Sequence, residues 1–288
     1  MLDRVYSVLE EMDIGEWVSV APVLREEDGS FYDVWTVTTT VETYILKKAK
    51  EREYAVYTDL LKEAPSGAPK LLTALRFMEE DYLLLEYVRG ENLCKCDRER
   101  LKLVLEALIA LQEHFWGKTE FDGVAVPFEE SLAHRKNRGK YLNDGEIEKA
   151  YADFLQQYPN LPRTLCHDDL LPFNVIAGEQ DAKLIDWESA GILPYPVSLA
   201  RLIAHGEEKA DAFFFMTEAD RQFAIDYYYD RLIRSKGIGY ADYRKALDGC
   251  LLYEYCEWIM LGVKYPEGDM TRYRQYLRKA KEHIKSMI

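Results

Sequence analysis

The sequence predicts an α+β protein in which a β-rich amino-terminal part, residues 1–90, precedes a larger, mostly helical part, residues 91–288. The first part contains β-branched and aromatic segments that are separated by polar turns. The second part has apolar residues at helical spacing, with a small β insertion near its middle. At 288 residues the chain is long enough for one large domain or for two lobes.

Five strands and one helix are expected in the amino-terminal part. The strand segments are residues 17–24, 31–38, 43–47, 71–77 and 81–88. An acidic turn, residues 26–30, separates the first two strands. The helix is expected over residues 51–63, because Tyr54 and Leu61 lie on one face at helical spacing. The order of elements is therefore β-β-β-α-β-β.

The second part begins with the strongest helical pattern, residues 98–116, in which apolar side chains form one continuous stripe. Further helices are expected at residues 132–158, 197–205, 218–235, 240–261 and 270–288. The β insertion is expected as three short buried strands at residues 163–166, 174–177 and 182–185. A polar turn at residues 178–181 joins the last two strands.

Composition indicates which partners and which cellular setting the chain favours. The net charge is −14, from 51 acidic and 37 basic residues, which disfavours nucleic acid and anionic membranes and favours cationic partners. Acidity that serves only solubility is the plainer alternative. No apolar run approaches the roughly 20 residues that cross a bilayer, and the first residues lack an export pattern. Five cysteines, including Cys94 and Cys96, are read as free thiols. A cytoplasmic monomer or weak dimer is expected.

One motif carries most of the chemical information. His167-Asp168-Asp169 is followed by Asn174, and an apolar strand then ends in Asp186-Trp187-Glu188. Asp169 could accept a proton from a substrate hydroxyl. Asn174 and Asp186 offer the hard oxygens that hold Mg²⁺ against nucleotide phosphates. The alternative is that these are loop residues that satisfy local backbone groups.

The motif resembles the aminoglycoside phosphotransferase and choline kinase superfamily, small-molecule kinases with a protein-kinase-like two-lobe fold. The usual pattern there is His-Gly-Asp-x4-Asn followed by Ile-Asp-Trp-Glu. The resemblance implies that Asp169 is the catalytic base and that Asn174 and Asp186 bind Mg²⁺, with His167 and Glu188 in support.

The sequence departs from the family pattern in two places. Asp168 stands where glycine is usual, and aspartate tolerates unusual backbone angles better than most residues do. Ser198 stands where an aspartate normally steadies the catalytic loop, which predicts weaker support for that loop.

The same resemblance implies the nucleotide site. Lys47, at the end of the third strand, would contact the α- and β-phosphates, and Glu53 of the next helix would hold it. Backbone groups from Glu86 to Val88 would pair with the adenine edge, and Ser30 is the candidate in the phosphate-covering loop. The choice between ATP and GTP stays open. Solvated surface charges are the alternative for Lys47 and Glu53.

The acceptor is expected against the carboxy-terminal helices, where carboxylates and aromatic residues concentrate. Besides Asp168, the candidate substrate residues are Glu254, Glu257 and Trp258, and further acids include Glu207, Glu208 and Asp269. A carboxylate among aromatic residues is costly unless it is paired, which suggests a cationic ligand. An aminoglycoside-like acceptor is favoured, and a choline-like one, bound by cation–π contacts, comes second. Helix core is the alternative role of the aromatic residues.

Two functions compete. The favoured one is a Mg²⁺- and nucleotide-dependent kinase for a hydroxyl of a small cationic molecule, with ATP or GTP as co-substrate. The other is a catalytically weak or inactive kinase-like binding or structural protein, of the kind that some spore-coat relatives are thought to be.

Overall fold

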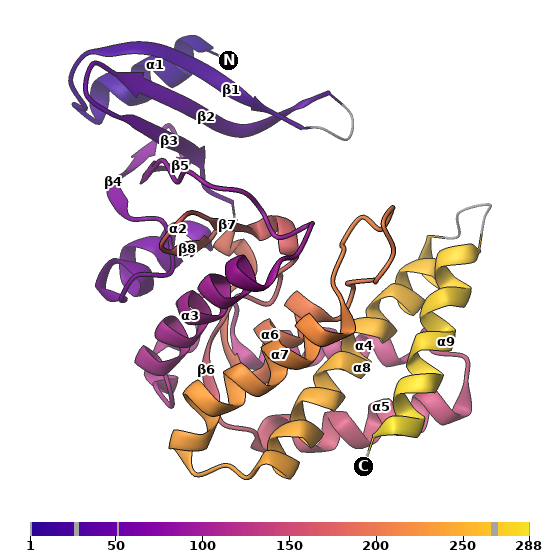
Figure 1. Cartoon of the computed structure of the whole chain (residues 1–288). Helices are drawn as coiled ribbons and strands as arrows, with labels where there is room; N and C mark the ends of the chain where they lie inside the picture. The colour runs from indigo at the N-terminus through magenta and orange to yellow at the C-terminus, as the bar shows by residue number, and fades with distance from the viewer. Residues whose placement is uncertain (1, 26–28, 51, 266–269, 288) are drawn as a thin grey trace.

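The structure, a computed structural model, describes residues 2–25, 29–50, 52–265 and 270–287 (Figure 1). A five-stranded sheet forms most of the amino-terminal part, and helices around two small sheets form the rest. The predicted α+β architecture is thus confirmed. Some residues of the predictions lie outside the described ranges. They are Glu26, Glu27 and Asp28 of the acidic turn, Glu51 of the expected helix, and Asp269.

The large sheet is antiparallel throughout, with the strand order β1-β2-β3-β5-β4. Its strands are β1 (Trp17–Leu24), β2 (Phe31–Thr39), β3 (Thr43–Lys48), β4 (Leu71–Phe77) and β5 (Glu80–Glu86). All five predicted strands are present. The main difference is that β5 ends at Glu86 instead of Val88, because the chain leaves the sheet there.

The connection from the sheet to the helical part depends on Gly90. Glu91 and Ala177 exchange two backbone hydrogen bonds of 3.0 and 2.8 Å. A Cβ atom at Gly90 would collide with the carbonyl oxygen of Ala177, so only glycine allows this approach. The contact ties the connection to β7 (Val175–Ala177).

A helix that the sequence reading missed, α1 (Leu2–Glu11), packs on the sheet. Val5, Val8 and Leu9 are buried there against side chains that include Trp35. The apolar residues recur at helical spacing, so the signal was present in the sequence.

The predicted helix after β3 is helical from Glu53 onward but changes its hydrogen-bonding pattern along its length. It consists of α2 (Glu53–Ala55), a π-helix η1 (Val56–Leu60) and a 3-10 turn η2 (Leu61–Glu63). Val56, Tyr57 and Leu60 are buried in the main core, which also contains residues of the helical part. The segment therefore joins the two parts of the molecule.

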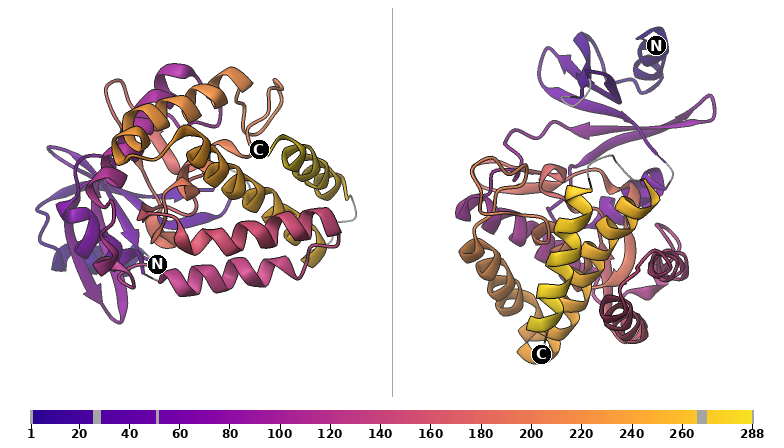
Figure 2. Two further views of the ribbon diagram at one scale, coloured as in Figure 1. Left: turned by 90° about the horizontal axis from the view of Figure 1, so that it is seen from below. Right: turned by 90° about the vertical axis from the view of Figure 1, so that its right-hand side faces the viewer.

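The helical part differs from the prediction mainly where one expected helix is two. Its α-helices are α3 (Arg98–His114), α4 (Phe128–Gly139), α5 (Gly145–Gln157), α6 (Pro196–Ile203), α7 (Glu218–Tyr228), α8 (Tyr240–Lys264) and α9 (Thr271–Ser286). The expected helix 132–158 is divided into α4 and α5, which lie side by side (Figure 2). Asp144 begins α5, because its side chain accepts a hydrogen bond from the Ile147 N–H at 3.4 Å.

Shorter turns complete this part of the chain. They are η3 (Thr119–Phe121), η4 (Tyr158–Asn160), η5 (Pro172–Asn174), η6 (Trp187–Ser189), the π-helix η7 (Tyr229–Ile233) and η8 (Arg234–Lys236). The expected helix 218–235 therefore begins as α7 and ends as η7 and η8. Among the described residues, no helix is both long and apolar enough to cross a bilayer.

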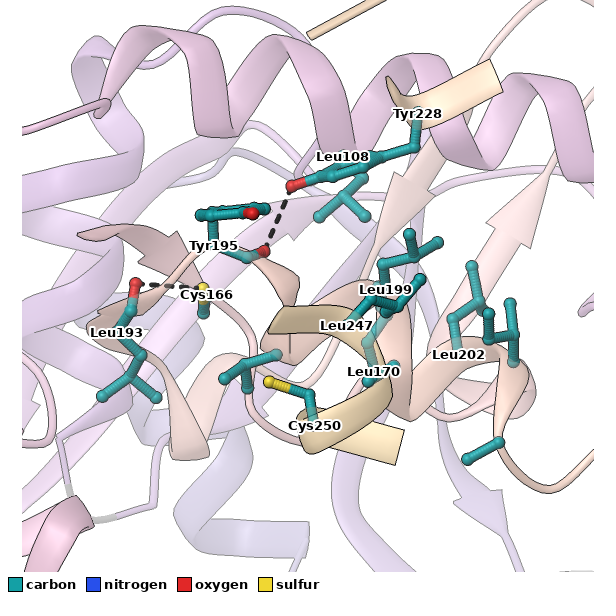
Figure 3. Close-up of a cluster of buried hydrophobic side chains, with 14 of the residues drawn as sticks. Leu108, Cys166, Leu170, Leu193, Tyr195, Leu199, Leu202, Tyr228, Leu247 and Cys250 are labelled. Carbon is teal, nitrogen blue, oxygen red and sulfur yellow. Dashed lines mark hydrogen bonds between the residues drawn. The ribbon is translucent and has the colours of Figure 1, made fainter. Parts of the chain in front are cut away.

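Two small sheets hold the loop that contains His167, Asp168 and Asp169. β7 pairs with β8 (Ala182–Leu184) as predicted, whereas β6 (Arg163–Cys166) pairs with β9 (Gly191–Pro194), a strand that was not expected. Figure 3 shows the buried cluster under this region, in which Leu170 packs among leucines of α6 and α8. Leu170 follows the acidic pair of the motif directly, so the core holds that loop in place. The five cysteines are free thiols.

Candidate active site

The loop between β6 and β7 brings Asp169 and Asn174 together. The turn η5 directs the Asn174 side chain back, so that its Nδ2 donates to the Asp169 backbone carbonyl at 2.8 Å. The same nitrogen lies 3.4 Å from Oδ2 of the Asp169 carboxylate. Asn174 is buried, and the Asp169 side chain keeps 34% of its surface exposed. The predicted base is therefore accessible to a substrate.

Asp168 adopts the backbone conformation that its glycine-like position requires, with φ of +50°. Its carboxylate forms an ion pair of 2.5 Å with Arg135 of α4, whose side chain is buried. The guanidinium of Arg135 lies 5.1 Å from the ring centre of Tyr158 and 4.5 Å from that of Tyr253. Asp168 is thus compensated inside the chain.

His167 holds the loop against the strand that carries Asp186. Its Nε2 lies 2.7 Å from the carbonyl oxygen of Ile185, and its ring packs on Trp187. Burial lowers the pKa of His167 to about 4, so the ring is neutral. Because a carbonyl oxygen only accepts, Nε2 carries the proton. Ser198 accepts a hydrogen bond of 2.9 Å from the His167 backbone N–H, so it also supports the loop.

Lys47 joins the sheet to the second part of the motif. Its Nζ lies 2.7 Å from Glu53 and 2.6 Å from Asp186. Burial lowers the pKa of Lys47, but the two carboxylates outweigh burial and the pKa is raised. Burial raises the pKa of Asp186, yet Lys47 lowers it further, so the net shift is downward. Both groups are therefore charged at neutral pH.

Asp186 lies beside Asn174. The Ile185 N–H donates to the Asn174 carbonyl at 2.9 Å, and Asp186 itself has φ of +66°. The Trp187 N–H donates to Glu53 at 3.2 Å, which fixes the turn after Asp186. The two predicted metal ligands thus meet on adjacent backbone segments.

The supporting residue Glu188 and the remaining predicted nucleotide residues are less closely grouped. Glu188 forms an ion pair of 3.0 Å with Lys50. Glu86 lies at the end of β5, 3.7 Å from Lys183, and Val88 is half-buried in the connection that follows. Ser30 is exposed just before β2 and does not line the cavity described below.

Arg201 of α6 is a site residue that the sequence reading missed. Its Nη2 and Nε donate to Oδ1 of Asp169 at 2.7 and 3.1 Å. Its Nη1 binds Glu254 at 2.7 Å and Glu257 at 3.0 Å. Burial raises the pKa of Asp169 to about 6, with Arg201 opposing this rise. Arg201 is the only charged residue in the mostly apolar segment 196–203. Such an isolated charge indicates a side chain with a buried partner, and this signal was available in the sequence.

The reason for expecting a cationic ligand at Glu254 and Glu257 does not hold, because the chain supplies their counter-charge. Glu254 is buried and binds Arg201, with His205 at 3.4 Å. Glu257 reaches the cavity but is paired with Arg201 and, at 3.2 Å, with Arg138. Trp258 does not line the cavity; it stacks on Tyr276.

A cavity of about 350 Å³ opens beside Asp169. The expected wall of carboxy-terminal helices is only partly correct, because α4 provides a large share of the lining. Its contributions fall at helical spacing, at Glu130, Ser131, His134, Arg135 and Arg138. Tyr253 and Glu257 of α8 and Arg201 of α6 complete the wall near Asp169.

Comparison with solved structures finds the same fold in several kinases. An aminoglycoside phosphotransferase from Alicyclobacillus acidocaldarius is 14% identical with a TM-score of 0.64, over 93% of this chain and 90% of that one. Choline kinase from Cryptosporidium parvum is 16% identical with a TM-score of 0.63, over 99% and 97%. A thermostable mutant of aminoglycoside phosphotransferase APH(4)-Ia, in ternary complex with ADP and hygromycin B, is 13% identical with a TM-score of 0.62, over 98% and 97%.

These identities are low and show a shared fold alone. No curated protein matches the chain by sequence. The model of the Phosphotransferase enzyme family matches residues 24–233, more than half of the chain. This span contains Lys47, Glu53, Asp169, Asn174 and Asp186. The chain therefore belongs to the phosphotransferase enzyme family.

Proposed function

We propose that this small-molecule phosphotransferase moves the γ-phosphate of ATP or GTP to a hydroxyl group of a compact acceptor, with Mg²⁺ as cofactor. Residues 1–90 form the nucleotide-binding lobe in this proposal, and residues 91–288 carry the catalytic loop and the acceptor site. The free cysteines favour a cytoplasmic setting, and we expect a monomer or weak dimer.

The observation that supports the proposal most strongly is the double ion pair of Lys47. Its ammonium group lies within 2.7 Å of Glu53 and 2.6 Å of Asp186, residues from different parts of the fold. A surface lysine has no need of two buried or half-buried carboxylates. An ammonium group fixed in this way suits nucleotide phosphates.

Asp169 acts as the base in this proposal. One carboxylate oxygen, Oδ1, receives both hydrogen bonds from Arg201, and Oδ2, which lies 3.4 Å from Nδ2 of Asn174, accepts the proton of the acceptor hydroxyl. Asn174 holds the backbone of Asp169 from the opposite direction. The carboxylate is thus oriented before the acceptor arrives.

The donor set next to Asp169 fits Mg²⁺. Asn174 and Asp186 provide hard oxygens on adjacent segments, and within the described residues no group of three or more His, Cys, Asp or Glu side chains could hold a metal alone. Mg²⁺ usually takes one or two protein ligands, with phosphate and water oxygens as the others. When bound, it would neutralise the β- and γ-phosphates.

The adenine contacts are proposed at Glu86 to Val88. Among the described residues, neither the N–H nor the C=O of Val88 has a hydrogen-bond partner in the fold, so both are available to a base edge. Ser30, which is exposed just before β2, remains a weaker candidate for the phosphates.

An aminoglycoside-like or choline-like acceptor was expected from the sequence. The pairing of Glu254 and Glu257 with Arg201 removes the main argument for a cationic acceptor. The proposal therefore requires only that the acceptor has a hydroxyl group that reaches Asp169. It does not specify the charge of the rest of the acceptor.

A coupled assay of ADP release tests this function over a panel of hydroxyl compounds that includes aminoglycosides, choline, homoserine and polyols. Turnover that requires both Mg²⁺ and an acceptor supports the proposal. Asp169→Asn is the matched control and should lose this turnover. Acceptor-dependent ADP release that survives in Asp169→Asn contradicts the role of Asp169.

The alternative, a kinase-like binding or structural protein, draws support from one observation. Arg201 already neutralises Asp169 within the fold, which weakens a base. Thermal unfolding separates the two functions. A Tm raised by ATP with Mg²⁺ but not by ATP alone favours the kinase, and no metal-dependent rise favours the scaffold.

A further inference from the structure

We infer that the acceptor is a hydroxylated compound with one anionic group, a carboxylate or a phosphate, and that Arg138 of α4 binds this group. The inference rests on the proposed phosphotransfer and adds the chemical class of the acceptor. It comes from the charge balance of the cavity beside Asp169.

Every carboxylate that lines the cavity already has a basic partner in the chain. The ion pairs are Glu130–Arg52 at 2.9 Å, Asp168–Arg135 at 2.5 Å, Asp169–Arg201 at 2.7 Å, Glu188–Lys50 at 3.0 Å and Glu257–Arg201 at 3.0 Å. The partners of Asp168, Asp169 and Glu257 are largely buried guanidinium groups, so an ammonium group of a polycation would have to compete with cations that are already in place.

The cavity is equally unsuited to a quaternary ammonium group. Within the part of the chain that the structure describes, Tyr253 is the only tyrosine, tryptophan or phenylalanine in its lining. The guanidinium groups of Arg135 and Arg138 lie 4.5 and 4.8 Å from the centre of that ring. The chain's own cations therefore occupy the π-surface that a choline-like ligand would use.

The donors that remain are cationic. Arg201 uses all three of its guanidinium nitrogens on Asp169, Glu254 and Glu257. Arg138 shares a single ion pair with Glu257, at 3.2 Å, and its buried Nη1 has no hydrogen-bond partner among the described residues. Because the Arg138 side chain lines the cavity and keeps 23% of its surface exposed, an oxyanion in the cavity can form a charge-assisted hydrogen bond with its guanidinium.

Position and size favour a compact acceptor. Arg138 and Asp169 line the same cavity and are linked through Glu257 and Arg201, so one compact acceptor can meet both residues. His134, one helical turn before Arg138 on the same face of α4, is exposed and can donate to the same anion. A volume of about 350 Å³ suits a sugar acid or sugar phosphate.

The test uses acceptors that differ mainly in charge. ADP release is measured with gluconate, sorbitol and 1-amino-1-deoxysorbitol, and glycerol 3-phosphate separates phosphate from carboxylate recognition. We expect kcat/KM to fall from the anion to the polyol to the amine. Arg138→Gln should raise KM for the preferred anion about tenfold, the effect of one lost charged hydrogen bond, and should have a clearly smaller effect on KM for the polyol.

Matched variants separate binding from folding. Lys136→Gln, an exposed position on α4 outside the cavity lining, should change nothing. Arg138→Lys keeps the charge and should keep part of the preference for the anion.

Two results overturn the inference. One is a higher kcat/KM for the amine than for the anion, and the other is an equal loss with anion and polyol in Arg138→Gln. If the protein binds Mg·ATP but phosphorylates none of the anions, the inference fails while the nucleotide site stands. If Mg·ATP does not bind, the proposed function fails as well.

Discussion

Arg201 donates two hydrogen bonds to a single oxygen of Asp169, at 2.7 and 3.1 Å, while its third nitrogen is held by Glu254 and Glu257. The guanidinium therefore has a fixed position, and so does the carboxylate. The arrangement orients Asp169, the proposed base, and also opposes the rise in its pKa that burial causes. Arg201 thus acts through Asp169 as a positioning residue.

Arg201 should control the acid side of the pH–rate profile. The pKa of Asp169 is raised to about 6, and the proposed base must be ionised, so kcat/KM should fall as the pH drops through about 6. Arg201→Gln removes the cation that opposes burial, and this limb should move to higher pH. Arg201→Lys, which keeps the charge, should move it less. Profiles that coincide in the wild type and Arg201→Gln contradict this account.

Asp169→Asn should separate chemistry from binding. The amide keeps an oxygen for Arg201 but cannot take the acceptor proton, so kcat should fall by about 10² to 10⁴. Nucleotide affinity, measured by calorimetry, should stay close to the wild-type value. A variant that loses nucleotide affinity in parallel with kcat would show that Asp169 has a binding role instead.

Lys47 should matter for both stability and turnover. Glu53 is fully buried, and Lys47→Ala leaves it without its cation, which should lower the free energy of unfolding by about 3 to 5 kcal/mol. The double variant Lys47→Met, Glu53→Gln should recover much of this stability without recovering activity. Denaturant unfolding and the ADP assay give the two readouts. Restored activity in the double variant would exclude a phosphate-binding role for Lys47.

Gly249 in α8 tests the packing behind the cavity. A Cβ atom there would collide with the ring of Phe154 on α5, so Gly249→Ala should cost about 1 to 3 kcal/mol through overpacking. Gly145→Ala is the control, because no atom lies within 4 Å of a Cβ at that position. It should be neutral or stabilising by up to about 1 kcal/mol, since alanine favours helices. Equal unfolding midpoints for the two variants would contradict the α5–α8 packing.

Local sequence signals predicted most of the elements and the loop that contains Asp169 and Asn174. Strands such as β1 are rich in β-branched and aromatic residues, and they were found with the same or nearly the same bounds. Asp169 and Asn174 are five residues apart, so one short loop determines their contact. The helix α1 was missed although its apolar spacing was readable.

Pairings between distant residues could not be read from local patterns. The contact of Lys47 with Asp186 spans 139 residues, and only the family resemblance suggested that these groups meet. Arg201 and Glu254 belong to different helices, so nothing near Glu254 in the sequence indicated its partner. For the same reason, the basic face of α4 was not connected with the acceptor site.

Calorimetric titration with a non-hydrolysable ATP analogue tests the central claim most directly, namely that Asn174 and Asp186 bind the cation that holds the nucleotide phosphates. In the wild type, Mg²⁺ should raise the affinity at least about tenfold, or about 1.4 kcal/mol. The gain should disappear in Asp186→Ala and persist in Asp169→Asn. An affinity that does not depend on Mg²⁺ in the wild type, or a gain that survives in Asp186→Ala, would contradict the account.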